Sequence, residues 1–242
     1  MNQVTQTRIE AIDVLRGLAL ALMLLVNNPG SWSAVYAPFL HANWHGLTPT
    51  DLVFPFFLFV VGASMACSLR GQLQTSGLSW YSIIKRSVLL FLIGFILQIV
   101  PFDQAPDTWR IMGVLQRIGL CFLLVAIMIA VIKERWLLLT CTIVLIVYWL
   151  ALLSAGENPY SVEGNLVRQV DMAVLGSSHI WQGKGLAFDP EGLLSTIGAS
   201  ITVLSGYLVC AKVLQQKTEK QQILQLLAVA VILLGVGLIC SI

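Results

Sequence analysis

The sequence predicts an all-α fold, a polytopic bundle of helices that crosses a lipid bilayer several times. Of its 242 residues, 57% are hydrophobic and only 11% are charged, whereas ordinary soluble domains carry roughly 25% charged residues. The mean hydropathy is +0.85. The apolar residues also gather in runs of about 17–25 residues, the length that a helix needs to cross a hydrocarbon core. The net charge of +2 adds little to this assignment.

Seven such runs are expected to be transmembrane helices, because a helix satisfies its own backbone hydrogen bonds in lipid. They cover residues 12–28, 51–69, 82–100, 111–132, 136–154, 192–211 and 222–242. The first run resembles a signal peptide, but Asp13 and Arg16 interrupt its start and no small-residue cleavage site follows. We therefore expect it to be retained, within a single membrane domain that covers residues 1–242.

Basic residues lie mainly on alternate connections between these runs. One set comprises Arg8, Arg70, Lys85, Arg86, Lys133, Arg135, Lys212, Lys217 and Lys220. The opposite connections carry none at 29–50, Arg110 before the fourth run, and Arg168 and Lys184 in the loop 155–191. The positive-inside rule then places the N-terminus in the cytoplasm. With no organelle targeting signal, we expect a multi-pass protein of the bacterial inner membrane.

The loop 155–191 is too long to be a simple connection and is rich in Gly, Pro, Asn and Trp, so we expect an ordered cap on the periplasmic side. The five cysteines all fall inside apolar runs. Their odd number and their spacing predict neither a disulfide framework nor a metal site. We expect small buried side chains and no metal.

Ionisable residues at membrane depth are costly and usually mark a partner, a cavity or a substrate path. Asp13 and Arg16 share one side of the first helix and are expected to pair there. They either lock helix packing or line a cytoplasmic entrance for a charged ligand.

A second group of polar residues converges on the periplasmic side. It comprises Asn27 and Asn28 at the end of the first run, His41 and His45 in the next loop, Asp51 at the start of the second run, and Gln116 and Arg117 in the fourth. Each has a structural alternative. Asp51 is suited to capping its helix, the histidines to loop packing, and Trp32, Trp44 and Trp109 to the membrane interface. Arg117 needs an acidic partner or an anionic ligand, and Asp51 is the nearest acid by topology.

These residue types fit acyl transfer. Histidine is the usual general base near neutral pH, asparagine amides donate to a developing oxyanion, and arginine binds phosphate or carboxylate with two parallel hydrogen bonds. The set therefore suits transfer of an acyl group from a phosphate-bearing donor. A transporter whose polar residues line a substrate path is the alternative.

Four segments carry a family resemblance. They are "DVLRGLALALMLLVNNPG", "HANWHGLTPTDLVFPFFLFVVGASM", "RIMGVLQRIGL" and "DPEGLLSTIGASITVLSGYL". In this order, from about residue 8 to 235, they resemble the signature segments of the heparan-α-glucosaminide N-acetyltransferase family, which includes bacterial homologues. The resemblance implies a polytopic enzyme that moves an acetyl group from cytoplasmic acetyl-CoA to the amine of a terminal glucosamine across the membrane.

The resemblance also implies roles for individual residues. His41 matches the catalytic histidine of the family, Asn27 the asparagine that helps hold the acetyl group or its oxyanion, and Asp51 an aspartate of the catalytic segment. Asn28, Gln116 and Arg117 are expected on the donor side. His45 inherits no role, since the lysosomal branch carries asparagine there. Both an acetyl-histidine intermediate and direct transfer would use His41.

The resemblance further implies several helices beyond Ile242, so we expect the domain to be incomplete at its C-terminal end. The expected partners are an amino sugar or glycan acceptor (in a bacterium, from chitin or cell wall) and the lipid bilayer, with no nucleic acid; a homodimer is a further expectation. The alternatives to an enzyme are an amino-sugar permease or transport accessory protein and a non-catalytic membrane subunit.

Overall fold

The computed structural model describes residues 9–31, 33–183, 185–216 and 218–240, and all regular secondary structure in these ranges is helical. The α-helices are α1 (Glu10–Asn27), α2 (Pro49–Thr75), α3 (Trp80–Ile99), α4 (Val114–Val131), α5 (Glu134–Leu153), α6 (Leu166–Leu175), α7 (Leu193–Val213) and α8 (Glu219–Cys240). Three short 3₁₀ turns are η1 (Ala37–Phe39), η2 (Pro106–Thr108) and η3 (Ser177–His179). The all-α prediction is thus confirmed for these ranges.

Five of the described helices, α2, α3, α4, α5 and α7, are long and apolar enough to cross a membrane. The first and last predicted runs correspond to α1 and α8. Among the residues used above, Arg8, Trp32, Lys184 and Lys217, together with the last two residues of the final run, lie outside the described ranges. Within those ranges the chain has the character of a helical membrane protein.

Two helix boundaries differ from the expected runs in ways that matter for the site. Helix α2 begins at Pro49 and continues to Thr75, because Thr48 and Asp51 form a capping box at its start. Helix α4 begins at Val114, since Gly113 before it is fully extended (φ −177°, ψ −175°). Gln116 and Arg117 therefore lie in the first turn of α4 and not deeper in it.

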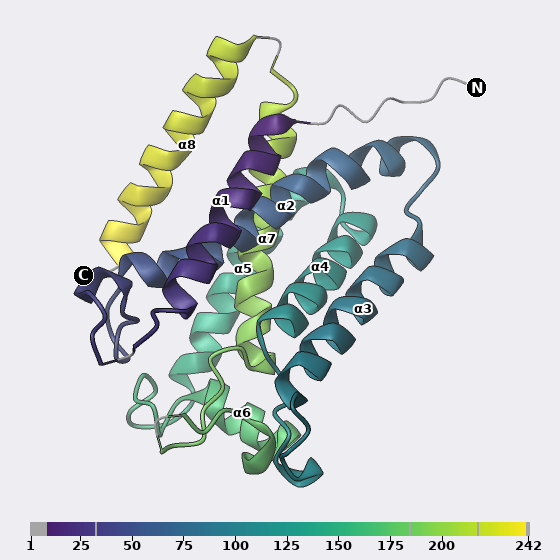
Figure 1. Ribbon diagram of the computed structural model, residues 1–242. Coiled ribbons are helices and arrows are strands. Elements are labelled where there is room, and N and C mark those ends of the chain that lie inside the picture. Colours follow the sequence, from purple (N-terminus) through teal and green to yellow (C-terminus); the bar gives the residue numbers. More distant parts are fainter. Residues whose placement is uncertain (1–8, 32, 184, 217, 241–242) are drawn as a thin grey trace.

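Helices α2 and α7 form the centre of the bundle and run in the same direction (Figure 1). Two glycines let their backbones approach closely: a Cβ on Gly62 would collide with the carbonyl of Val203, and one on Gly206 with that of Phe59. Further along the pair, the Cys67 and Cys210 sulfurs are 3.9 Å apart. Asp51 thus lies at one end of the bundle, and the last turns of α2 and α7 lie at the other.

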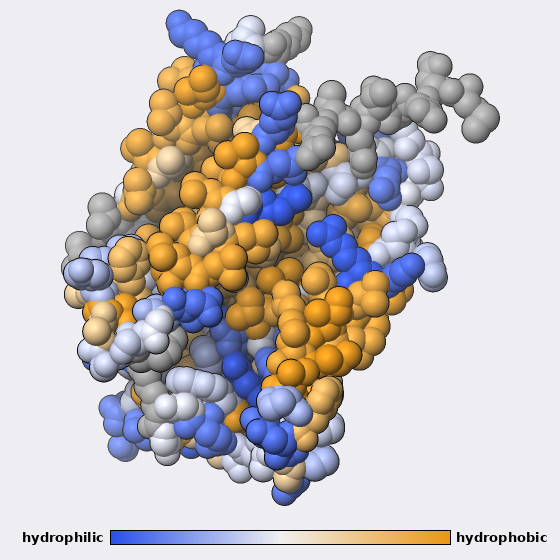
Figure 2. Space-filling view, in the orientation of Figure 1, coloured by the Kyte–Doolittle hydropathy of each residue, from blue (hydrophilic) through white to orange (hydrophobic). Residues whose placement is uncertain are grey.

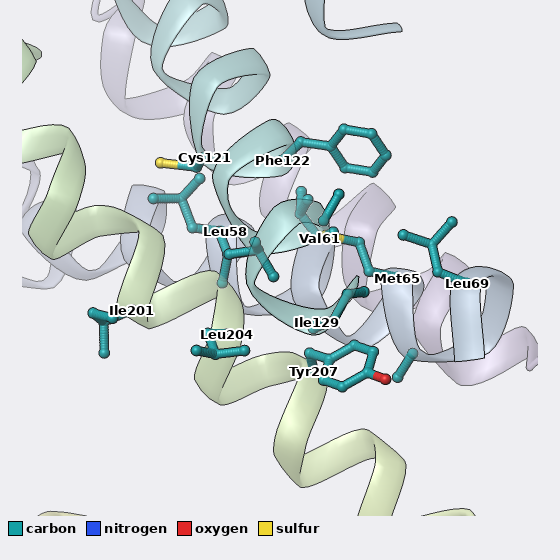
Figure 3. Packing of buried hydrophobic residues seen from close by; sticks show 14 of the residues in the cluster. Leu58, Val61, Met65, Leu69, Cys121, Phe122, Ile129, Ile201, Leu204 and Tyr207 are labelled. Atoms are coloured by element: carbon teal, nitrogen blue, oxygen red, sulfur yellow. The ribbon is translucent and has the colours of Figure 1, made fainter. Parts of the chain in front are cut away.

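The hydrophobic core fills the space between α2, α4 and α7, as Figure 3 shows. Leu58 and Met65 of α2, Phe122 of α4, and Leu204 and Tyr207 of α7 all point into it. Helix α3 packs antiparallel on α4. This core occupies the middle of the bundle, so polar sites are confined to its two ends and to the outer surface.

The outer surface is largely apolar across the middle of the bundle. Figure 2 shows hydrophobic residues over most of the helical face, with hydrophilic residues gathered mainly towards its two ends. Large side chains such as Leu92 and Leu97 of α3 and Leu145 and Leu150 of α5 are exposed. Such a band is expected where lipid replaces water.

The predicted pair on the first helix is present. Arg16 Nη1 lies 3.4 Å from Asp13 Oδ1, and Arg16 Nη2 donates to the hydroxyl of Ser64 on α2 at 2.5 Å. The pair therefore ties α1 to α2. Cys121 and Cys141 are buried as expected, whereas Cys67 and Cys210 are partly exposed.

Candidate active site

The loop between α1 and α2 presents His41 beside the first turn of α2. His41 Nδ1 lies 2.7 Å from Asp51 Oδ1, and the backbone N–H of Ala42 donates to Asp51 Oδ2 at 3.2 Å. Thr50 Oγ1 donates to the carbonyl of Pro38 at 3.1 Å, which ties the η1 turn to the same helix end. These contacts hold the imidazole in one place on a loop that is otherwise open to its surroundings.

Asp51 also caps α2, which was the structural alternative considered for it. Its Oδ2 accepts from the backbone N–H and the hydroxyl of Thr48, both at 2.9 Å. One carboxylate therefore stabilises the helix start with Oδ2 and orients the histidine with Oδ1. The structural and functional interpretations of Asp51 are compatible with each other.

The Asp51 contact determines which nitrogen of His41 carries the proton. An ionised carboxylate can only accept hydrogen bonds, so Nδ1 must be the donor. In the neutral imidazole, Nε2 then has a free lone pair. The side chain of His41 is 53% exposed and that of Asp51 is 24% exposed, so the ring remains accessible. The pair can act as a general base or a nucleophile with an orienting carboxylate.

The two asparagines at the end of α1 differ in their contacts. Asn28 donates its side-chain amide to the carbonyl of Leu24 at 2.9 Å and so caps α1. Asn27 is exposed, and its amide forms no hydrogen bond with any residue in the described part of the chain. The amide of Asn27 is thus available to a ligand, whereas that of Asn28 already has a structural bond.

Gln116 and Arg117 are buried where α4 begins. Gln116 is 0% exposed and donates to the carbonyl of Ile111 at 3.2 Å. Arg117 is 8% exposed and donates through Nη2 to the carbonyl of Pro190, at 2.7 Å, and to the hydroxyl of Ser195. The Arg117 Nε and the Gln116 Oε1 are buried without a partner in the described ranges.

The predicted pairing of Arg117 with Asp51 is wrong. The hydrogen bonds of Asp51 go to the His41 loop and to Thr48, while Arg117 reaches towards the segment that precedes α7. The reason is packing: Arg117 lies on the face of α4 that meets α7, where the carbonyl of Pro190 and the hydroxyl of Ser195 accept its hydrogen bonds.

The acidic residues near the start of α4 come from the end of the 155–191 loop. Arg110 Nε and Nη2 donate to the two Asp189 carboxylate oxygens at 2.9 and 2.6 Å, and Nη2 also donates to Glu191. Asp189 is fully buried. Burial by itself lowers the pKa of Arg110, but the bond to Asp189 and the charges of Asp189 and Glu191 outweigh it and raise that pKa. This buried ion pair fastens the loop to the bundle.

Asp171 lies in α6, a helix that the sequence did not predict, and its side chain caps the N-terminus of α7. Its Oδ1 accepts from the backbone N–H groups of Leu193 and Leu194 at 2.8 and 3.3 Å, while Oδ2 is buried without a partner in the described ranges. Burial raises the pKa of Asp171, and the two backbone bonds oppose that rise without cancelling it. The loop 155–191 is therefore pinned to both α4 and α7.

This loop also reaches the His41 loop through aromatic residues. Trp44 Nε1 donates to the carbonyl of Tyr160 at 2.7 Å, and its ring meets Phe188 edge to face, with centroids 4.9 Å apart. The Tyr160 hydroxyl in turn accepts from Trp149 Nε1 at 2.9 Å. Trp44, three residues from His41, therefore joins the two loops.

Sequence reasoning missed Asp171, Asp189, Glu191, Ser195 and helix α6. Two signals were present: Asn165 before the α6 residues and Gly176 after them are typical helix boundaries. The segment "DPEGLLS" contains Asp189, Glu191 and Ser195. Their pairing with Arg110 and Arg117 was not evident from the spacing. Within the described residues no cluster of three or more metal-ligating side chains occurs.

Known proteins match this chain over most of its length. The sequence pattern of the family described as "Heparan-alpha-glucosaminide N-acetyltransferase, catalytic" matches residues 8–171. The chain is 30% identical to the human heparan-alpha-glucosaminide N-acetyltransferase, over 90% of this chain and 40% of that protein. It is also 30% identical to the mouse protein of the same name, over 94% of this chain and 42% of that protein.

The matched region contains the His41 loop, the first part of the 155–191 loop with Tyr160, and both members of the His41–Asp51 pair. The chain spans about two fifths of the length of these relatives. It belongs to the heparan-alpha-glucosaminide N-acetyltransferase family.

Proposed function

We propose that this protein is a membrane-embedded N-acetyltransferase that moves an acetyl group from acetyl-CoA to the amine of a terminal, glucosamine-like sugar. The observation that carries the proposal is the pair formed by His41 Nδ1 and Asp51 Oδ1 at 2.7 Å. It leaves an exposed imidazole whose Nε2 is free to take a proton or to attack a carbonyl carbon. The named activity of the family relatives supplies the reaction type.

In direct transfer, the acceptor nitrogen attacks the carbonyl carbon of the thioester and Nε2 of His41 takes the proton that the amine loses. The carbon–sulfur bond breaks, and its electron pair leaves with the sulfur of CoA. In the two-step alternative, Nε2 attacks first and the amine then takes the acetyl group from the imidazole. Both routes need the Nδ1–H bond to Asp51.

Asn27 is proposed to donate its amide to the carbonyl oxygen as negative charge develops there, because that amide has no bond within the described residues. Asn28, Gln116 and Arg117 are proposed on the donor side. The support for Arg117 is its buried Nε–H, which has no partner in those ranges and which an anionic group would satisfy.

The proposed topology has seven spans (α1, α2, α3, α4, α5, α7 and α8) in a bacterial inner membrane, in one domain over residues 1–242 with a cytoplasmic N-terminus. The His41 loop and the cap at 155–191 then face the periplasm. The alternation of basic residues among the connections supports this orientation. Acetyl-CoA would come from the cytoplasm, the acceptor would be an amino sugar or glycan, and the proposed assembly is a homodimer.

The decisive experiment is a pair of substitutions in the intact protein. His41→Ala should reduce acetylation of an amino-sugar acceptor to background while leaving the thermal unfolding midpoint unchanged, because His41 is exposed. His45→Asn, four residues away, should retain activity. If the wild type forms no acetylated product and His41→Ala abolishes amino-sugar uptake, the protein is a permease and not an acetyltransferase.

The orientation has its own test in a cysteine-free background. Leu47→Cys should react with a membrane-impermeant maleimide in intact spheroplasts, because Leu47 is 70% exposed in the His41 loop. Thr218→Cys, before α8, should react only after the membrane is opened. The reverse pattern would place the His41 loop in the cytoplasm.

A further inference from the structure

A groove runs along the outside of the bundle between α5, α7 and α8, at the end away from His41. Its volume is about 660 Å³, which is in the range of small-molecule sites. Its walls below the helix ends are apolar and include Leu138 of α5, Leu208 of α7, and Val229 and Ile232 of α8. These apolar walls favour an occupant with a hydrocarbon surface over water.

The end of the groove is basic. Arg135 and Lys212 line it together with Glu134. The Glu134 carboxylate is already engaged, since Arg70 Nη2 donates to it at 3.2 and 3.4 Å and Gln215 donates at 3.4 Å. Arg135 and Lys212 form no ion pair within the described residues. The mouth of the groove therefore carries uncompensated positive charge.

Gln225 of α8 also lines the groove. Its Oε1 is shielded from solvent and accepts no hydrogen bond in the described part of the chain. A buried acceptor normally has a donor, so a hydroxyl group of a ligand would satisfy it. The groove thus offers an apolar channel, a hydrogen-bond acceptor on its wall and two cations at its mouth.

We propose that this groove binds an anionic glycerophospholipid, with an acyl chain between α5, α7 and α8 and the phosphate at Arg135 and Lys212. The charge at the mouth favours this occupant, because a zwitterionic lipid brings no net negative charge to the two cations and an apolar helix brings none at all. A soluble anion would meet the cations but leave the apolar walls uncovered. In the proposed topology the lipid belongs to the cytoplasmic leaflet, where basic side chains meet anionic head groups. The site is independent of the proposed catalytic activity.

The test measures lipid binding to the intact, purified protein in nanodiscs of dioleoyl phosphatidylcholine, titrated with dioleoyl phosphatidylglycerol. Arg135→Gln/Lys212→Gln should weaken phosphatidylglycerol binding by about fivefold for each charge removed. Val229→Trp, which fills the apolar channel and keeps both cations, should weaken it as well. Lipids retained on the protein are counted by native mass spectrometry, and the unfolding midpoint gives a second readout.

The matched control is Lys85→Gln/Lys220→Gln, which removes the same charge at the same end of the bundle without touching the groove. It should leave phosphatidylglycerol binding unchanged. Equal losses in the two double variants would show unspecific attraction to the leaflet and overturn the proposal. Full competition by glycerol 3-phosphate alone would show a free-phosphate site, and a Val229→Trp protein that changes from dimer to monomer would show a subunit interface.

Discussion

The His41 loop and the Arg110–Asp189 cluster are both polar sites at the cap end of the bundle, yet they are built in opposite ways. In the first, one carboxylate holds an imidazole that is 53% exposed and leaves one nitrogen free. In the second, a fully buried carboxylate uses both oxygens on one guanidinium. The first arrangement leaves a reactive group available, whereas the second uses its charges to hold two segments together. Substitutions in the first should therefore change activity, and those in the second stability.

The largest expected effect is that of Asp51→Asn on catalysis. An amide can turn its NH₂ group towards Nδ1 and so favour the tautomer in which Nε2 carries the proton. We expect kcat to fall by about 10²–10⁴-fold, the range seen when a base is lost or wrongly oriented. The cap of α2 should weaken by only about 1 kcal/mol, since asparagine also caps helices.

The control for this prediction is Thr48→Ala. It removes the hydroxyl that donates to Asp51 Oδ2 but leaves the contact of Oδ1 with His41. It should cost similar stability in a denaturant titration with little change in kcat. Equal losses of kcat in the two variants would mean that the helix cap, and not the orientation of His41, sets the activity.

The next effect is on stability and comes from the buried cluster. Asp189→Asn leaves Arg110 with only the Glu191 carboxylate, and breaking a buried ion pair costs about 3–5 kcal/mol. We expect a lower unfolding midpoint, with residual activity per folded molecule largely kept. Glu134→Gln, which breaks the more exposed pair with Arg70 at the other end of the bundle, should cost at most about 1 kcal/mol. Similar losses would show that burial does not distinguish the two pairs.

The smallest effect is a pH dependence at Asp171. Its folded-state pKa is raised from the ordinary 3.8 by burial, so the protonated carboxyl is the form that the fold favours. The contribution to stability is present in full below 3.8 and is lost as the pH rises through the folded-state pKa. Asp171→Asn, which mimics the neutral form, should gain stability relative to the wild type as the pH rises from the ordinary 3.8 through the raised folded-state pKa of Asp171. Parallel curves of unfolding midpoint against pH would refute this.

Much of the helical arrangement was predictable, because apolar length is a property of each segment alone. Each of the seven expected runs overlaps one long helix, whereas α6 was missed because it is short and lies in a loop. The polar residues at the cap end were also predictable as a group. Their pairing was not: Asp51 was expected to meet Arg117, but it contacts His41 instead.

Composition and hydropathy are enough to predict a helical membrane protein, the approximate position of its long helices and the residue types available for chemistry. The tertiary structure decided which partner each charged side chain takes, including Asp189 for Arg110 and Pro190 and Ser195 for Arg117. The physical reason is that hydropathy depends on local composition, whereas a hydrogen bond depends on direction. Whether two distant side chains meet is set by which face of each helix packs on its neighbour and by how the loops fold back on the bundle.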